Sequence, residues 1–303
     1  MSLDKVKLAV LSLIIANIIW GAAFPIYKWT LEVIPPFTFA FLRFFLGALI
    51  ILPFAYKNLY FQRRDIPWLI LLSLLSVTLL IPLLFLGLKL SPSINAPIII
   101  SSGPVFLIIG AWFFLKDKVT SKVLGGTLLS LLGVMVIIFR PFIEAGLSGG
   151  ILGNFLIFLA TLCSVAQALT LKKLTERNNL ISIVFWMFLI GSIPLLVPIF
   201  LKESSYLNFS LLNNQAFWGI LYGVIFASVI AHLLLTFGIK YIKASEIGVF
   251  SYVDPIATIL VAVPLLGEKI TSTYIAGAFL VFLGIFIAEK RIHYHPLSRL
   301  LGK

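Results

Sequence analysis

The sequence predicts an all-α polytopic membrane protein with ten transmembrane helices, arranged as two five-helix repeats of inverted topology. The composition, the spacing of the apolar runs and an internal repeat each favour this fold class. Of the 303 residues, 61% are hydrophobic and 11% are charged, whereas a soluble domain carries about 25% charged residues. The apolar residues form runs of about twenty, which is the length a helix needs to cross a hydrocarbon core of about 30 Å.

The apolar runs define ten spans that are joined by short loops. We place them at 7–28, 36–56, 67–88, 93–115, 121–140, 151–171, 180–201, 215–239, 244–266 and 271–289. The first run follows Lys5 and Lys7, as in a signal peptide, but it is too long and lacks a small-residue cleavage site, so we interpret it as a span. The longest loop, 202–214, is too small to be a domain.

The positive charges predict the orientation of the chain. With ten spans both termini lie on one side, and 17 of the 23 Lys and Arg residues fall on that side, whereas 5 fall on the other and Arg43 lies inside a span. Cytoplasmic loops carry the excess of Lys and Arg, so both termini are predicted in the cytoplasm and the protein in the cytoplasmic (inner) membrane. The net charge of +12 lies in loop clusters and not on one basic face, so no nucleic-acid partner is expected.

An internal repeat relates the two halves of the chain. Residues 87–138 align with residues 238–289 without a gap and share 13 identities over 52 positions. Chance similarity between apolar helices would match Leu and Ile, but this alignment matches Pro104 with Pro255, Lys118 with Lys269, Gly126 with Gly277 and Gly133 with Gly284. Since five spans is an odd number, the halves are expected to cross the membrane in opposite directions. Inverted repeats are typical of secondary transporters, whose substrate site lies near the midplane.

Several motifs carry a resemblance to a known family. They are Trp20-Gly21 and Phe24-Pro25, FLRFFLGALIILP in the second span, the GP…K(D/E)K pattern ending the fourth and ninth spans, and GGTLLSLLG and AGAFLVFLG. Over about residues 7–289 the chain resembles the EamA family of the drug/metabolite transporter superfamily. The resemblance implies one EamA repeat at 1–145, a second at 146–291, a cytoplasmic basic tail at 292–303, and alternating access that exports or exchanges metabolites or drugs. In the sixth span Cys163-Ser164 replaces the Trp-Gly pair, so the halves differ chemically.

Two charged residues lie at membrane depth. Arg43 is interpreted either as a structural tie between helices or as a site that recognises an anion through its planar fork. Asp254 is interpreted either as the ion-pair partner of Arg43 or as an unpaired carboxyl that takes up a proton, because an isolated charge is costly to bury. Pro255 cannot donate to the carbonyl one turn earlier, near Ser251, so this carbonyl is expected to face a cavity.

The remaining polar residues of the spans give a candidate substrate-binding lining. His232 is either a proton relay or a neutral histidine bonded to a neighbouring helix. The candidates for substrate contact are Trp20, Gln167, Tyr252, Ser101 and Asn17, each of which has helix–helix packing or hydrogen bonding as its alternative role. Tyr27 is either additional stacking surface or an interfacial aromatic.

Several classes of protein are poorly supported. The sequence lacks G-x-x-x-x-G-K-[ST], so transport is not expected to use ATP on this chain. It also lacks H-E-x-x-H and acidic clusters, and it has one cysteine, Cys163. We therefore expect no enzymatic activity, no catalytic residue, no metal and no cofactor.

The sequence thus favours a secondary transporter for amino acids or similar polar or aromatic metabolites, acting as a proton-coupled antiporter or a facilitator. Small-molecule substrate, membrane lipids and protons are the expected partners, and the chain is expected as a monomer or homodimer. Two alternatives stay open. A flippase-like carrier of lipid-linked substrates would need a cavity that opens sideways between helices, and a non-transporting receptor or assembly subunit would need no alternating states.

Overall fold

The computed structural model describes residues 3–103, 105–106, 121–145, 149–204, 213–242 and 248–289. Residues 104 and 107–115 of the predicted fourth span and the tail at 292–303 lie outside the described residues. The α-helices are α1 (Leu3–Thr30), α2 (Pro36–Ala55), α3 (Ile66–Ser73), α4 (Leu80–Leu90), α5 (Asn95–Ser101), α7 (Ser121–Ala145), α8 (Gly149–Thr175), α9 (Leu180–Ser192), α10 (Leu196–Pro198), α11 (Asn214–Leu221), α12 (Ala231–Tyr241), α14 (Asp254–Leu266) and α15 (Ser272–Glu289).

The described part of the chain contains seven helices that are long and apolar enough to cross a membrane. They are Lys5–Thr30, Pro36–Asn58, Arg63–Leu90, Leu124–Glu144, Gly150–Thr175, Leu180–Glu203 and Asn214–Tyr241. The predicted ninth and tenth spans correspond to the shorter apolar helices Phe250–Leu266 and Ser272–Ile287, and α5 is the described beginning of the fourth. All regular structure in the described residues is helical, which confirms an all-helical polytopic protein.

Three predicted spans contain a π-helical segment. The third contains the π-helical segment η3 (Leu74–Leu79), the seventh contains η5 (Ile199–Glu203), and the eighth contains η8 (Tyr222–Ile230). A π-helical turn bonds each N–H to the carbonyl five residues earlier, and such turns occur often at functional sites. They leave backbone carbonyls that side chains of other helices can reach.

Local residues determine where several helices begin and end. Asn179 and Asn213 accept hydrogen bonds from backbone N–H groups in the first turns of α9 and α11. The 3₁₀ segment η9 (Gly248–Val253) precedes α14, whose second residue is Pro255, a favoured place for proline. Gly267 ends α14 with φ 63°, a conformation that glycine adopts without strain. Asp254 therefore opens α14, and it does not lie in the middle of a continuous helix as the sequence predicted.

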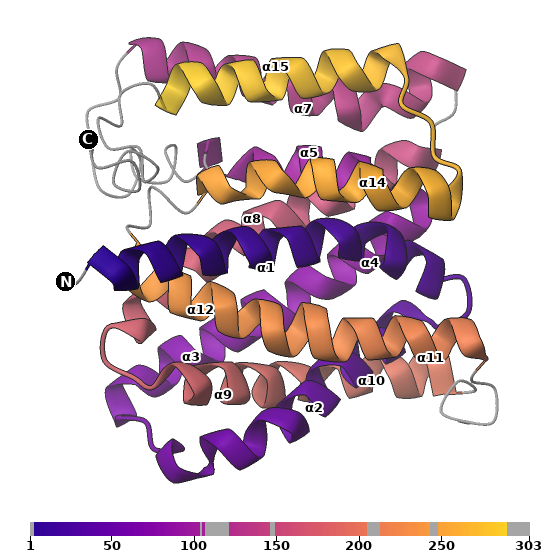
Figure 1. Cartoon of the computed structure of the whole chain (residues 1–303). Coiled ribbons are helices and arrows are strands. Elements are labelled where there is room, and N and C mark those ends of the chain that lie inside the picture. Colours follow the sequence, from indigo (N-terminus) through magenta and orange to yellow (C-terminus); the bar gives the residue numbers. More distant parts are fainter. Residues whose placement is uncertain are drawn as a thin grey trace.

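The helices run side by side in a bundle (Figure 1). α7 packs against α15 on one side of the bundle, and α2 packs against α9 on the opposite side (Figure 1). Between these pairs, α1 packs against α12 and α14, while α8 packs against α4. The two central pairs bring the first helix of each half against a helix of the other half.

Glycines allow the α7–α15 pair to pack closely. A Cβ atom added to Gly133 would lie 2.5 Å from the backbone N of Val281 and 2.7 Å from the carbonyl O of Gly277. A Cβ atom added to Gly284 would overlap the backbone of Ser130 and lie 2.6 Å from the carbonyl O of Gly126. These are backbone-to-backbone contacts, the kind that small residues permit between membrane helices.

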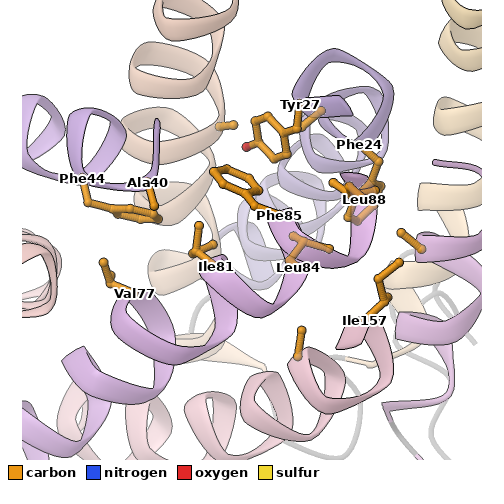
Figure 2. Packing of buried hydrophobic residues seen from close by; sticks show 14 of the residues in the cluster. Phe24, Tyr27, Ala40, Phe44, Val77, Ile81, Leu84, Phe85, Leu88 and Ile157 are labelled. Carbon is orange, nitrogen blue, oxygen red and sulfur yellow. The ribbon is translucent and has the colours of Figure 1, made fainter. Parts of the chain in front are cut away.

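Aromatic and branched side chains fill the interior of the bundle. Figure 2 shows Phe24 and Tyr27 of α1 packed near Phe85 and Leu88 of α4, with Ile157 of α8 close by. Tyr27 is only 2% exposed, so the interpretation of Tyr27 as an interfacial aromatic is wrong. Its ring is part of the core, within reach of residues from α2 and α4.

Candidate functional site

A polar centre lies where α1 crosses the eighth span. The indole Nε1 of Trp20 donates to the carbonyl O of Ala227 at 2.9 Å. The Nδ1 atom of His232 lies 3.1 Å from the same oxygen and 3.0 Å from the carbonyl O of Ser228. Ala227 and Ser228 belong to η8, so its irregular turn supplies carbonyls to side chains of two helices.

The His232 ring is enclosed by three aromatic rings. It meets Trp20, Phe44 and Phe188 edge to face, with centroid distances of 5.2, 5.8 and 5.1 Å. The side chain is buried, and Nδ1 contacts carbonyls four and five residues earlier in its own span, so the predicted bond to a neighbouring helix is not the one observed. A role of His232 in proton transfer stays a prediction.

Arg43 lies close to the same crossing. It is 1% exposed, and its Nε donates to the carbonyl O of Gly223 at 3.3 Å and to Oγ of Ser228 at 3.2 Å. These two contacts tie α2 to η8. The Cζ atom of Arg43 lies 4.3 Å from the ring centroid of Tyr27 and 5.0 Å from that of Phe44, so aromatic faces partly stabilise the buried cation.

Asp254 occupies a different face of α1. A Cβ atom added to Gly21 would lie 2.6 Å from the carbonyl O of Asp254, so α1 and α14 meet there without a gap. Gly21 contacts Asp254 whereas Tyr27 contacts Arg43, and residues six apart on a helix point about 120° apart. Helix α1 therefore separates the two charges.

The predicted ion pair between Arg43 and Asp254 is wrong, because the two side chains form none in the described structure. Asp254 is 3% exposed, and its Oδ1 has no hydrogen-bond partner among the described residues. As the first residue of α14, its carboxyl lies at the positive end of the helix dipole. The dipole offsets only part of the cost of burying a charge, so proton uptake by this unpaired carboxyl stays a prediction.

The other predicted lining residues are distributed along the bundle. Ser101 of α5 donates to the carbonyl O of Ser251 at 3.3 Å, which is the carbonyl that Pro255 leaves without an i+4 donor. Asn17 is buried and donates to Leu13 O of its own helix at 2.7 Å. Gln167 of α8 is 8% exposed, and Tyr252 of η9 meets Phe282 edge to face at 5.6 Å. Only Trp20, His232 and Arg43 share the η8 centre, so a substrate role for the others stays a prediction.

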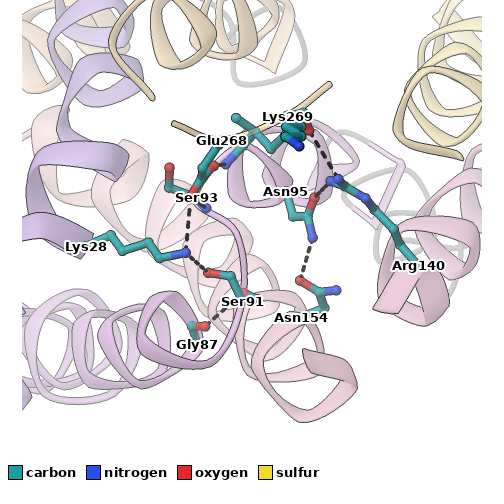
Figure 3. Close-up of polar contacts among 10 residues, drawn as sticks. Lys28, Gly87, Ser91, Ser93, Asn95, Arg140, Asn154, Glu268 and Lys269 are labelled. Atoms are coloured by element: carbon teal, nitrogen blue, oxygen red, sulfur yellow. Dashed lines mark hydrogen bonds and ion pairs between the residues drawn. The ribbon is translucent and has the colours of Figure 1, made fainter. Parts of the chain in front are cut away.

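A second polar cluster lies at the end of the bundle that holds Lys28, which we call the Lys28 end. The carboxylate of Glu268 accepts the backbone N–H of Ser93 at 2.7 Å and of Ile94 at 3.0 Å, just before α5 (Figure 3). The Nζ of Lys28 donates to Glu268 at 3.1 Å and to the carbonyl O of Ser91 at 2.8 Å. One carboxylate thus joins α1 and the segment before α5 to the end of α14.

Arg140 extends this cluster to two more helices. Its Nη1 donates to Asn95 Oδ1 at 2.8 Å, and its Nη2 donates to the carbonyl O of Lys269 at 3.2 Å (Figure 3). Asn95 in turn donates to Asn154 Oδ1 at 3.1 Å. Asn95 and Asn154 are fully buried, so α5, α7 and α8 are held together by a connected polar network.

Lys172 marks the opposite end of the bundle, which we call the Lys172 end. Its Nζ donates to the carbonyl O of Ile239 at 2.7 Å and of Ile242 at 2.9 Å. Ile239 lies in the last turn of α12 and Ile242 follows its end, just as Ser91 follows the end of α4. Among the described residues Lys172 has no ion pair.

Sequence reasoning did not single out Glu268, Glu203 or Tyr222 as functional. The sequence signal for Glu268 is an acid that comes directly after an apolar run. Glu203 lies in the same position after the seventh run and accepts the backbone N–H of Thr38 at 2.7 Å at the start of α2. Tyr222 carries no sequence signal, and its hydroxyl donates to the carbonyl O of Ile19 at 2.8 Å. Among the described residues no group of three His, Cys, Asp or Glu is placed to hold a metal ion.

The fold and the buried polar centre define an integral multi-pass membrane protein. A model of the EamA-like transporter family matches residues 7–139 and again residues 151–289. The chain belongs to the EamA-like transporter family. This confirms the family resemblance that the sequence motifs carry.

Whole-length relatives and a solved structure agree with this assignment. An uncharacterized transporter of Archaeoglobus fulgidus is 26% identical over 93% of this chain and 98% of its own length. The uncharacterized transporter YyaM of Bacillus subtilis is 28% identical over 90% of each chain. A protein crystal structure with 16% identity has a TM-score of 0.67 and covers 97% of this chain and 98% of its own, which shows a common fold.

Proposed function

We propose that the protein is a secondary transporter that moves small metabolites across the cytoplasmic membrane by alternating access. Amino acids or related polar and aromatic compounds are the proposed substrates, and the protein acts as an exporter, an antiporter or a facilitator. We propose further that its two five-helix halves, 1–145 and 146–291, are inverted repeats, with both termini in the cytoplasm. The Lys28 end of the bundle then faces outward.

The pairing of helices supports the inverted repeat. Exchanging the halves converts the α1–α12 contact into the α8–α4 contact, and it converts the α2–α9 and α7–α15 pairs into themselves. At the α7–α15 pair, Gly133 meets Gly277 and Gly284 meets Gly126. The sequence alignment makes Gly126 the mate of Gly277 and Gly133 the mate of Gly284. Exchanging the halves therefore also converts each of these two glycine contacts into the other.

The two lysines at opposite ends of the bundle carry the proposal. Lys28 and Lys172 both lie 21 residues after the first residue of their family match, and each donates to the carbonyl that follows its neighbouring helix, Ser91 or Ile242. Ile242 is the repeat mate of Ser91. Lys28 also pairs with Glu268, whose repeat mate Asp117 lies outside the described residues. Equivalent lysine contacts at opposite ends of the bundle are what an inverted repeat with mirror-related states would supply.

Counterflow into proteoliposomes tests this proposal. Wild type and Asp254→Asn are compared for uptake of a labelled amino-acid and metabolite panel at imposed internal and external pH. We expect exchange of at least one panel compound, and we expect Asp254→Asn to abolish its accumulation under a pH gradient while retaining exchange, because Asp254 is an unpaired buried carboxyl. Accumulation by the variant equal to wild type contradicts proton coupling at Asp254, and no uptake of any compound contradicts the proposed substrate class.

One observation favours the lipid-linked carrier as a second candidate. A groove of about 610 Å³ lies between α1, α11 with η8, and α14, and its lining includes Ile26, Trp218, Tyr222 and Leu260. The lining is almost wholly apolar, and Leu260 is 71% exposed. An apolar opening of this kind between helices is what lateral entry of an acyl chain requires. Lipid extraction and mass spectrometry of purified protein would test it, since a flippase-like carrier should retain a lipid stoichiometrically.

A further inference from the structure

The buried guanidinium of Arg43 has more donors than partners. No carboxylate forms an ion pair with it among the described residues, and its Nη1 has no hydrogen-bond partner. The hydroxyl of Tyr27 lies next to the guanidinium, close enough for the two groups to interact, but it makes no hydrogen bond of normal geometry. An unsatisfied buried donor is costly, and most such groups in folded proteins are paired. Two adjacent unsatisfied groups beside an uncompensated positive charge therefore require an explanation.

A purely structural role accounts for only part of this arrangement. The Nε contacts with Gly223 and Ser228 tie α2 to η8, and the ring of Tyr27 faces the cation. Neither uses Nη1 or the Tyr27 hydroxyl. A glutamine could make a comparable tie without placing a charge at membrane depth.

We propose that Arg43 and Tyr27 form the subsite that binds the carboxylate of the transported molecule, which is a small compound with one acidic group and an apolar or aromatic body. This proposal rests on the proposed transport function. A guanidinium edge and a phenol hydroxyl side by side present two donors to one carboxylate, with the bond to the charged donor being the stronger. A carboxylate that accepts a hydrogen bond from each donor would pair the two groups, Arg43 Nη1 and the Tyr27 hydroxyl, that make no hydrogen bond of normal geometry in the structure.

The surroundings of Arg43 favour a carboxylate over a phosphate. Among the described residues, the titratable groups next to the guanidinium are Tyr27, Tyr222 and His232, so Arg43 is the only permanent cation in the described part of this site. One positive charge matches one negative charge, whereas a phosphate monoester carries about −1.5 to −2 near neutral pH. The nearby rings of Phe39 and Phe85, stacked with centroids 4.9 Å apart, favour an apolar or aromatic body beside the acid. Figure 2 shows Tyr27 and Phe85 adjacent at this place.

The subsite also lies where the proposed transport motion would act on it. Arg43 bonds to η8, and Trp20 of α1 bonds to the same π-helical segment. Movement of α1 against η8 would change the distance between Tyr27, on α1, and Arg43, on α2. Carboxylate affinity should therefore depend on which state the protein occupies.

Matched acid and amide pairs test the proposal by direct binding. Full-length protein in lipid nanodiscs is titrated with benzoate and benzamide, phenylacetate and phenylacetamide, and L-phenylalanine and L-phenylalaninamide, with thermal stabilisation as the readout. We expect wild type to bind the acid of at least one pair at least tenfold more tightly than its amide, because a hydrogen bond to a charged group is at stake. Arg43→Gln should remove this difference and Arg43→Lys should retain only part of it.

Tyr27→Phe keeps the proposal falsifiable even where Arg43 variants fail to fold. It removes a hydroxyl that makes no hydrogen bond of normal geometry and retains the ring over the cation, so the unliganded protein should melt at the wild-type temperature or higher. Acid binding should weaken about tenfold. Tyr274→Phe is the matched control, because it also removes a buried hydroxyl without a partner, at the Lys28 end, and it should bind acids as wild type does.

Three results would overturn the subsite. One is equal binding of acids and amides by wild type, and another is unchanged acid binding in both Tyr27→Phe and Arg43→Lys. The third is a combination of two observations: chloride stabilises wild type relative to gluconate and Tyr27→Phe abolishes this effect, while wild type shows no preference for acids over amides. An inorganic anion would then be the ligand. Transport of panel compounds without acid preference would leave the proposed function intact, whereas acid binding without any transport would contradict the proposed function alone.

Discussion

The Nζ of Lys28 lies 3.1 Å from Oε1 of Glu268, and the same carboxylate accepts the N–H groups of Ser93 and Ile94. Lys28 is near the end of the first helix of one half, and Glu268 follows α14 in the other half. The contact therefore closes one end of the bundle across the boundary between the halves. In the transport proposal this contact holds the outer end of the bundle closed, so the Lys28 and Glu268 side chains must separate before that end can open.

Replacing Glu268 with Gln should open the Lys28 end. The amide retains one acceptor but loses the charge that binds Lys28 and two backbone N–H groups, and such charge-assisted bonds are the strong ones. In a Cys163→Ser background, Ser91→Cys should react slowly with a membrane-impermeant thiol reagent, because Ser91 is 4% exposed. We expect Glu268→Gln to raise the labelling rate at position 91 about tenfold.

Lys269→Cys controls for the reagent, since residue 269 is exposed and should label at the same rate with or without Glu268→Gln. Equal labelling of Ser91→Cys in both backgrounds would show that the contact does not hold this end closed.

The α7–α15 pair should not tolerate a methyl group at its glycines. Gly133→Ala and Gly284→Ala would each force a Cβ atom into the backbone of the facing helix, so the helices must separate. We expect each variant to lower the melting temperature in detergent by several degrees. Gly125→Ala is the matched control, because a Cβ atom there would meet nothing within 4 Å and alanine favours a helix over glycine. A Gly133→Ala protein as stable as Gly125→Ala would contradict the close crossing.

Asn95→Ala should destabilise the protein through its neighbours. The substitution leaves Nη1 of Arg140 and Oδ1 of Asn154 without their partner in a buried site. Leaving buried groups unsatisfied costs about 1–3 kcal/mol, and more where one is charged. Denaturant unfolding measures this loss, and Asn58→Ala, at an exposed position, should stay within about 0.5 kcal/mol of wild type. Equal stability of the two variants would contradict a connected network.

The length of the apolar runs predicted most of the helices. Runs of about twenty apolar residues specify spans because a bilayer cannot hydrogen-bond an exposed backbone. The interruptions were missed, since nothing in LLSVTL or YGVIFASVI distinguishes η3 or η8 from an α-helix. The start of α14 at Asp254 was missed although Pro255 points to it, because apolar residues continue on both sides.

The sequence predicted which residues form the candidate site better than it predicted how these residues are arranged. Trp20, His232 and Arg43 were named from their depth, and they do share the η8 centre. Sequence depth alone placed Asp254 near Arg43, because depth gives position along the membrane normal and not around a helix. The Lys28–Glu268 contact joins residues 240 positions apart, and only the packed structure brings such residues together.

Counterflow through a protein whose Lys28 end can be locked tests the central claim most directly. Lys28→Cys and Glu268→Cys are combined in the Cys163→Ser background and joined by a short, reducible bifunctional thiol reagent in proteoliposomes. Alternating access predicts that uptake of a transported panel compound stops when the cross-link forms and returns when a reductant cleaves it, while each single-cysteine protein treated with the same reagent continues to transport. Uptake that is the same with the cross-link intact and cleaved would contradict alternating access through this end.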